Sequence, residues 1–222
     1  MNECFIEQFE LCDHQHGLTI FDVGASFGQT AEVYAALVPN CKLHCFEPFL
    51  DAFTILAKNC SHIPNISFIN KAVSDVDGEA MLYVNSSSLT NSLLETDNDN
   101  AHKVWGNGLL ETKYANSVST ITLDSYISEK QIPYVDILKI DVQGAENKVL
   151  LGASKSFSER KIGLVYTEII TASTYINQVG YNRTIELMDS FRYDLLKLYN
   201  HSYDGAGQLR QVDALFVPRV NV

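Results

Sequence analysis

Three residues near the start of the chain, Asp22, Gly24 and Gly28, form a DxGxxxG pattern that begins inside an apolar segment at residues 18–23. This segment predicts a short buried strand. Gly24 has no Cβ atom, so the backbone can turn sharply there and approach a ligand. Gly28 opens a predicted helix whose free N–H groups face the same place. The pattern predicts a nucleotide-cofactor turn, with an ordinary tight strand-to-helix turn as the alternative.

The glycine spacing also indicates which kind of cofactor fits. A dinucleotide-binding turn has three glycines as GxGxxG, so that a pyrophosphate can sit at the start of the helix. Ala25 and Phe27 occupy positions where further glycines could stand. The spacing therefore favours a cofactor without a pyrophosphate.

An acidic residue, Glu47, ends the next predicted strand at residues 42–46 and follows Gly24 by twenty-three positions. In a βαβ unit, an acid at the end of the second strand reaches the glycine turn of the first and accepts hydrogen bonds from ribose hydroxyls. Glu47 therefore strengthens the interpretation of the glycine turn as a nucleotide site.

A second set of ionisable residues lies in a nearly continuous apolar run, VDILKIDV, at residues 135–142. Such a run is typical of a central parallel strand, and its alternation places Lys139 and Asp141 on one face. Asp141 stands at the carboxyl end of this strand, and Glu168 stands at the equivalent end of the strand predicted at residues 162–169. This is where α/β sheets bind ligands. A carboxylate or a neutral lysine at this position could take a proton from a hydroxyl group.

Two alternatives to a catalytic role remain open for these residues. Lys139 could pair with Asp141 or Glu168 in an ion pair that only ties adjacent strands together. Asp141 and Glu168 could also be oxygen ligands of a divalent metal ion. The metal site is not favoured, because two carboxylates without a nearby Asn or third acid are too few protein ligands for a divalent ion.

The elements that must position these residues alternate between strand and helix patterns. The 222 residues, 46% of them hydrophobic, suit a single α/β domain over residues 1–222. Strands are predicted at residues 18–23, 42–46, 66–73, 79–84, 118–123, 135–142, 162–169, 195–199 and 212–217, and helices at 28–38, 49–59, 144–151 and 185–191.

One long stretch, residues 85–117, interrupts this pattern. It is rich in Ser, Asn, Asp and Gly and shows no sustained periodicity. Long loops of this kind are usually lids or disordered, but scattered apolar residues, including Trp105, argue against full disorder. We expect a substrate-covering insertion rather than a linker.

Charge and composition exclude several classes of partner. The net charge of −11 and the isoelectric point near 4.9 argue against nucleic acid or an anionic membrane, and no local basic patch is evident. No apolar run reaches the roughly eighteen residues of a membrane span, and the N-terminus lacks the features of a signal peptide. The five cysteines form no CxxC pair, so reduced thiols and a cytoplasmic location are expected.

Five segments in the same order resemble the FkbM family of S-adenosylmethionine-dependent methyltransferases: FDVGASFGQT, CFEP, KAVSDVDGEAMLYV, STITLDSYI and VDILKIDVQGAENKVLLGA. The resemblance implies the class I methyltransferase fold, a Rossmann-like three-layer sandwich with a mostly parallel seven-stranded sheet and an antiparallel last strand. It also implies methyl transfer to a hydroxyl oxygen of a sugar, glycan or natural product, with S-adenosylhomocysteine as the second product.

The resemblance also implies where the cofactor and the acceptor would bind. The methionine part would lie over the glycine turn, the ribose on Glu47, and the adenine beside Phe49 and residues 72–74. From the strand pattern we expect Asp141 to be the acceptor-facing acid, assisted by Glu168 and Lys139, with the choice of proton acceptor among them left open. The implied cofactor-binding set is Asp22, Gly24, Ala25, Ser26, Gly28, Glu47, Pro48, Phe49, Ala72, Val73 and Ser74.

Two positions depart from the family pattern. Ser26 stands where the family usually has Asn and should still allow a hydrogen bond near the cofactor. Gln143 stands where the family often has Glu, which removes one carboxylate from the expected site.

The main rivals are an NAD(P)-dependent oxidoreductase and a non-catalytic nucleotide- or glycan-binding module. This sequence lacks the third glycine of a dinucleotide-binding turn and the YxxxK pair that would indicate an oxidoreductase. The acceptor is expected to be a small molecule or glycan. The insertion should supply the acceptor contacts, but it contains no motif that identifies the acceptor. The short N-terminus leaves the active site incompletely covered, which favours a homodimer.

Overall fold

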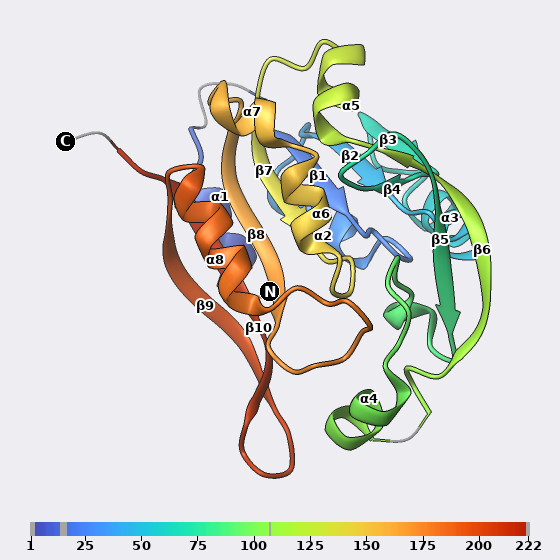
Figure 1. Cartoon of the computed structure of the whole chain (residues 1–222). Helices are drawn as coiled ribbons and strands as arrows, with labels where there is room; N and C mark the ends of the chain where they lie inside the picture. The colour runs from blue at the N-terminus through green and yellow to red at the C-terminus, as the bar shows by residue number, and fades with distance from the viewer. Residues whose placement is uncertain (1–2, 14–16, 107, 221–222) are drawn as a thin grey trace.

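A computed structural model describes residues 3–13, 17–106 and 108–220 of the chain (Figure 1). Its main sheet has seven strands, and β10 runs antiparallel to both of its neighbours while the other pairings are parallel. This is the predicted class I methyltransferase sheet. The strand order is β3 (Ile66–Ile69), β2 (Lys42–Phe46), β1 (Thr19–Val23), β7 (Val135–Ile140), β8 (Ile162–Ile170), β10 (Leu209–Pro218) and β9 (Tyr193–Tyr203).

Helices cover both faces of this sheet, because successive residues of the central strands are apolar on both sides. Ile20 of β1 packs in the cluster beneath one layer, and the adjacent Phe21 packs in the cluster beneath the other. One layer contains α1 (Glu3–Glu10), α2 (Gln29–Leu37) and α3 (Leu50–Asn59), and the other contains α5 (Leu123–Glu129), α6 (Glu146–Leu151), α7 (Ser154–Ser158) and α8 (Tyr181–Ser190).

A second, three-stranded sheet lies beside the first, with the order β4 (Ala72–Val73), β6 (Thr112–Ile121) and β5 (Gly78–Asn85). The single strand predicted at residues 66–73 is therefore wrong, because the chain leaves the main sheet after Ile69 and enters the second sheet at Ala72. β6 also begins six residues before the predicted start at Val118. Residues 113–117 are exposed, so they carry no apolar alternation that could indicate a strand.

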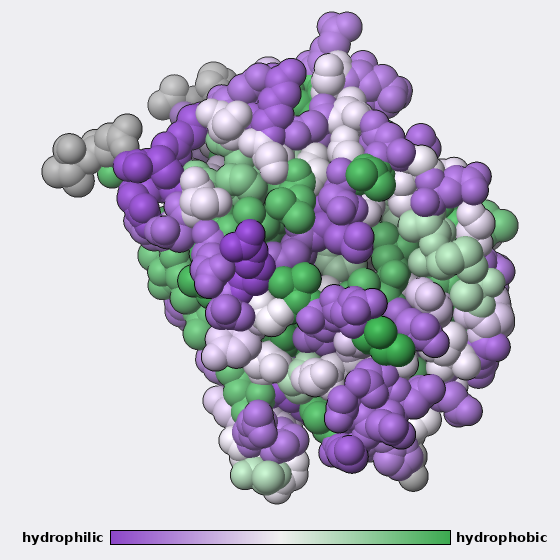
Figure 2. Space-filling view, viewed as in Figure 1, coloured by the Kyte–Doolittle hydropathy of each residue, from purple (hydrophilic) through white to green (hydrophobic). Residues whose placement is uncertain are grey.

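The other described residues of the predicted insertion are folded as well. It contains the short 3-10 helix η1 (Ser88–Thr90) and α4 (Asn98–Trp105), whose outer surface is hydrophilic in Figure 2. Trp105 Nε1 donates to Thr174 Oγ1 at 2.9 Å, and the Arg210 guanidinium lies 4.6 Å from the Trp105 ring centre. The backbone N–H of Ile176 donates to the Glu95 carbonyl at 2.7 Å. These contacts hold the insertion against the loop between β8 and α8, at the carboxyl edge of the main sheet.

Several boundaries differ from the sequence-based expectation. α8 begins at Tyr181 rather than residue 185, because its polar first turn lacks apolar periodicity. α6 begins at Glu146, after a loop that includes Gly144 in a left-handed conformation. α1 and α7 are short helices that the hydrophobic pattern does not indicate. No described helix meets the length and apolarity that crossing a membrane requires.

We predict that Gly24→Ala destabilises the fold. Gly24 has a φ of +78°, and an added Cβ would lie 1.9 Å from the Asp141 carbonyl oxygen, so backbone must move on one side or the other. The free energy of unfolding, measured by urea denaturation, should fall by at least about 2 kcal/mol. Gly205→Ala is the matched control, because nothing lies within 4 Å of its added Cβ. An equal loss in both variants would contradict this account of the turn.

Candidate cofactor and active site

The glycine turn after β1 is bonded directly to the end of β2. The backbone N–H groups of Gly24 and Ala25 both donate to the Phe46 carbonyl at 3.0 Å. Gly28 precedes α2 with a φ of +94°, and a Cβ there would lie 2.4 Å from Sγ of Cys60, which follows α3 in the same layer. The two strand ends that the sequence placed together are therefore adjacent.

Glu47 is buried at this junction, with 8% of its surface exposed. Its Oε2 accepts a hydrogen bond from the Ser26 backbone N–H at 2.9 Å, and its Oε1 accepts one from the Phe49 N–H at 2.8 Å. Burial raises the pKa of Glu47 to about 7, although these two hydrogen bonds oppose the shift. Each oxygen still has a second lone pair, so the carboxylate can accept further bonds from a ligand.

A cavity of about 310 Å³ opens beside Glu47, at the carboxyl ends of β1, β2 and β7. Its volume lies in the range of small-molecule sites. Leu82 of β5 and Asn91 of the insertion also contribute to its wall. Six of the predicted cofactor residues line it, namely Gly24, Ser26, Glu47, Pro48, Ala72 and Val73.

The other five predicted cofactor residues support the wall without lining it. Ala25 is buried within the glycine turn, and Gly28 begins the following helix. Phe49 contributes its backbone N–H to Glu47, and the Ser74 N–H donates to the Ile121 carbonyl. Asp22 lies beneath the turn, with no exposed surface.

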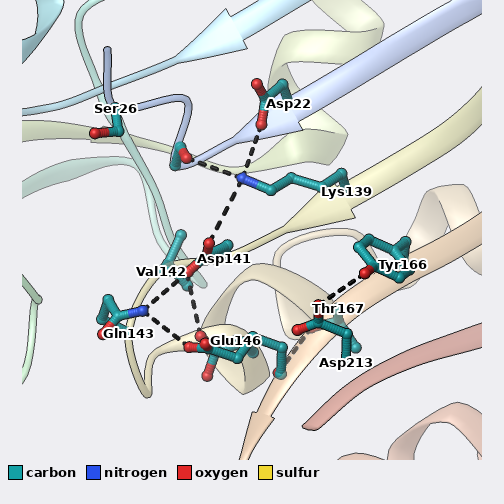
Figure 3. Close-up of polar contacts among 12 residues, drawn as sticks. Asp22, Ser26, Lys139, Asp141, Val142, Gln143, Glu146, Tyr166, Thr167 and Asp213 are labelled. Carbon is teal, nitrogen blue, oxygen red and sulfur yellow. Dashed lines mark hydrogen bonds and ion pairs between the residues drawn. The ribbon is translucent and has the colours of Figure 1, made fainter. Parts of the chain in front are cut away.

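Asp22 pairs with Lys139, as Figure 3 shows. The distance from Lys139 Nζ to Asp22 Oδ1 is 2.9 Å, and Nζ also donates to the Gly24 carbonyl at 3.0 Å. Asp141 Oδ2 is farther away, at 3.9 Å. The alternative of an ion pair between Lys139 and Glu168 is therefore wrong. Lys139 pairs with Asp22 and with Asp141, and the contact with Asp141 is the longer of these two.

The charge state of Lys139 follows from these neighbours. Burial alone would lower the pKa of Lys139, but the carboxylates of Asp22 and Asp141 outweigh burial and raise this pKa above its ordinary value. Lys139 therefore stays protonated. The expected neutral lysine, ready to take a proton, is wrong for this site.

Gln143 connects the two candidate catalytic acids, and Figure 3 shows it beside Asp141. Its Nε2 donates to Asp141 Oδ1 at 3.0 Å and to Glu168 Oε2 at 2.9 Å. The Tyr175 hydroxyl donates to Gln143 Oε1 at 3.3 Å. Gln143 thus holds both carboxyl groups in place, a role that the sequence pattern does not reveal.

The two acids differ in their exposure. The Asp141 side chain is 42% exposed and lines the cavity, whereas Glu168 is buried behind Gln143. Burial, followed by the nearby carboxyl groups of Asp141 and Glu146, raises the pKa of Glu168 well above its ordinary value. Asp141 is therefore the acid that a second substrate can reach.

Glu146 is a further buried acid that the sequence analysis missed. One of its oxygens accepts hydrogen bonds from the backbone N–H groups of Val142 and Gly144 at 3.2 and 3.1 Å. Burial raises the pKa of Glu146 to about 7. Its place at the start of α6, directly after a glycine loop, was a signal for such a role. Glu146 fixes the loop that carries Gln143.

Two buried polar atoms on the cavity wall have no hydrogen-bond partner among the described residues. They are the Ser26 hydroxyl oxygen and the Asn91 amide nitrogen. Buried polar atoms are normally bonded, so both are available for a ligand. Together with the Glu47 carboxylate and the apolar Ala72 and Val73, they fit a polar nucleoside such as S-adenosylmethionine. Asn91 belongs to no recognisable motif, so sequence reasoning could not find it.

The described part of the chain contains no group of three or more His, Cys, Asp or Glu side chains that could hold a metal ion. Between Asp141 and Glu168, the Gln143 amide directs N–H donors at both carboxyl groups. A metal ion shared by Asp141 and Glu168 would have to displace the Gln143 amide from the space between them.

We predict that the affinity for S-adenosylhomocysteine depends on pH through Glu47. Ribose hydroxyls bond an ionised acceptor more strongly than a neutral one, and Glu47 ionises only as pH rises through about 7. The dissociation constant should therefore increase as pH falls below this value and level off about tenfold higher, where the carboxyl group is neutral. Isothermal titration calorimetry across this range checks the slope.

Glu47→Gln is the control for this prediction. It removes the titrating group, so binding should be weaker above pH 7 by about tenfold and should lose its pH dependence. A wild-type affinity that is constant between about pH 6 and 8 would contradict the assignment of ribose to Glu47.

Comparisons with known proteins agree with this geometry. The family model of the methyltransferase FkbM domain matches residues 22–195. The chain is 26% identical over 196 residues to the 2-O-methyltransferase NoeI of Sinorhizobium fredii. The aligned region covers 86% of this chain and 78% of NoeI.

Solved structures show the same fold at low sequence identity. The methyltransferase FkbM of Methylobacillus flagellatus KT has a TM-score of 0.54 and 13% identity, over 90% of this chain and 43% of that one. An rRNA methylase of Streptococcus thermophilus has a TM-score of 0.55 and 12% identity, over 98% of this chain and 95% of that one. The family match extends over more than half of the sequence and includes the glycine turn, Glu47, Lys139 and Asp141. The chain therefore belongs to the FkbM family of S-adenosylmethionine-dependent methyltransferases.

Proposed function

We propose that the protein transfers a methyl group to a hydroxyl oxygen of a small-molecule or glycan acceptor. The observation that carries this proposal is the placement of Asp141, a partly exposed carboxylate at the wall of the cofactor cavity. The similarity to a 2-O-methyltransferase supports oxygen as the methylated atom. Membership of a methyltransferase family decides against the NAD(P)-dependent oxidoreductase that the sequence left open.

Different residues of the cavity would contact different parts of the cofactor. S-adenosylmethionine supplies an electrophilic methyl group on a positively charged sulfur. Glu47 would accept hydrogen bonds from the ribose, and Ala72 and Val73 would contact the adenine. Ser26 and Asn91 carry the unpartnered polar atoms that would bond the remaining polar groups of the cofactor.

Asp141 would orient the acceptor and take its proton. Most of the acceleration in a methyl transfer comes from holding the acceptor oxygen in line with the methyl group. Gln143 donates to Asp141 Oδ1 and fixes the carboxylate, and Oδ2, which lies 3.9 Å from Lys139 Nζ, is the oxygen left for the acceptor. A base so placed accepts a hydrogen bond from the acceptor hydroxyl and receives its proton as the new bond forms.

Glu168 and Lys139 are positioning residues in this proposal. Glu168 accepts a hydrogen bond from Gln143, and burial raises the pKa of its carboxyl group well above the ordinary value. Lys139 is charged and bonded to Asp22 and to the glycine turn, so it holds the strand ends in register. Neither needs to touch the acceptor.

The acceptor class is the least constrained part of the proposal. A hydroxyl of a sugar, glycan or natural product fits a site whose exposed carboxylate is bordered by the insertion. The acidic chain makes nucleic acid a poor acceptor. A homodimer and a cytoplasmic location stay predictions from the sequence.

We predict that Asp141→Asn separates cofactor binding from turnover. The amide has the same size, so S-adenosylhomocysteine should bind with about the wild-type affinity. Loss of the proton acceptor should reduce turnover by about 10²–10⁴-fold. Turnover is measured as transfer of a labelled methyl group into a candidate glycan or natural-product pool, with the product identified by mass spectrometry.

Asp189→Asn is the control, because Asp189 is an exposed acid on α8 that pairs with Arg219. This variant should keep full turnover. Wild-type turnover in Asp141→Asn would contradict the assigned role. Loss of activity in EDTA, restored by magnesium, would contradict the metal-free mechanism.

A further inference from the structure

A second cavity, of about 810 Å³, lies outside the site described above. It is a groove against β2 and β3, bordered by α5 and by residues 130–133 that follow it. Figure 1 shows β2, β3 and α5 together at the upper edge of the molecule. The groove meets the cofactor cavity at Lys71, which lines both. Nothing in the proposed methyl transfer uses it.

Three lysines from separate elements line this groove. Lys42 begins β2, Lys71 follows β3, and Lys130 follows α5. Lys42 and Lys71 form no ion pair within the described part of the chain. Glu129 is the one carboxylate among the lining residues, and it pairs with Lys130 at 2.9 Å.

This cluster corrects the expectation that the chain has no basic patch. The lysines are 29 and 59 positions apart in the sequence, so only the fold brings them to one groove. In a chain with a net charge of −11, three lysines and one carboxylate line this groove, and Asp77 interacts with Lys71 from outside the lining, so the positive potential is strongest at Lys42 and Lys130. An anionic ligand would be attracted here although the mean surface repels it.

The floor of the groove is largely uncharged. The His44 Nδ1 atom lies 2.9 Å from the Tyr126 hydroxyl, which leaves the other ring nitrogen unengaged by this contact. Burial, and then Lys42 and Lys130, lower the pKa of His44 to about 4, so its ring is neutral at physiological pH. Ile121 and Ile132 are buried apolar parts of the same floor.

We propose that this groove binds a nucleoside diphosphate. The diphosphate oxygens would accept hydrogen bonds from Lys42 and Lys130, and the nucleoside would pack on the floor around His44 and Ile132. Lys71 lies past the carboxyl end of β3, at the other end of the groove, and would add only to the positive potential. Two ammonium groups from separate elements suit a ligand with several anionic oxygens better than they suit a single carboxylate. The volume falls in the range of small-molecule sites and is large enough for both parts of such a ligand.

The groove and the cofactor cavity share a wall, which determines how the proposal must be tested. Asn70 lines the groove, and its amide nitrogen donates to the Glu47 carbonyl at 2.8 Å and to the Pro48 carbonyl at 3.1 Å. Substitutions at Asn70 or Lys71 would therefore disturb the cofactor site as well. Lys42 and Lys130 line only the groove, so they are the residues to change.

The test is a calorimetric titration of uridine diphosphate into the full chain saturated with S-adenosylhomocysteine, so that the cofactor cavity is filled. We expect binding in the micromolar range that weakens as salt is added. The double variant Lys42→Glu/Lys130→Glu should weaken this binding by at least about tenfold and keep the affinity for S-adenosylhomocysteine. That retained affinity shows that the variant is folded.

The charge-matched control is Lys155→Glu/Lys161→Glu, because both lysines lie at α7 or just after it and pair with Glu159. This variant should bind uridine diphosphate as the wild type does. Inorganic pyrophosphate should bind more weakly than uridine diphosphate, because it cannot use the floor. Absence of binding, an unchanged affinity in the Lys42→Glu/Lys130→Glu variant, or equal affinity for pyrophosphate would overturn the proposal.

Discussion

The ammonium group of Lys139 is the contact on which the rest of the site depends. Asp22 and Lys139 are directly opposite each other in the register of β1 and β7, and their side chains form a buried ion pair at 2.9 Å. The same nitrogen bonds the Gly24 carbonyl, so it fixes the turn that leads to the cofactor cavity. Asp141 follows two residues later at the end of β7. One charged group thus sets the positions of the cofactor turn and of the acceptor-facing acid. Buried ion pairs add little net stability, and here the pair specifies geometry.

The acidic residues around this centre differ because their surroundings differ. Glu47, Glu146 and Glu168 are buried, and burial raises the pKa of each. Asp141 is open to the cavity and is held by Gln143. The roles that we propose for these acids, as ribose ligand, loop anchor, positioning acid and proton acceptor, rest on these differences in environment, since the side chains are chemically alike.

The sequence predicted those parts of the site that depend on local pattern. Gly24, Glu47 and Asp141 each stand at the end of an apolar run, and parallel strands bring such ends to one edge of the sheet. The partner of Lys139 was not predictable in this way, because it depends on the register between β1 and β7. Asn91 and the groove lysines come from segments that only the tertiary fold brings together. β6 was partly missed because its exposed residues carry no apolar alternation.

A double-mutant cycle on the free energy of unfolding tests the central claim most directly. The cycle compares Asp22→Asn, Lys139→Met and the double variant with the wild type by urea denaturation. Because Lys139→Met leaves the Asp22 carboxylate buried without its partner, it should cost about 3–5 kcal/mol, and the double variant should recover a large part of this loss. A coupling of about 2 kcal/mol or more is expected. Losses that simply add would contradict the account, because they would show that the two charges do not depend on each other.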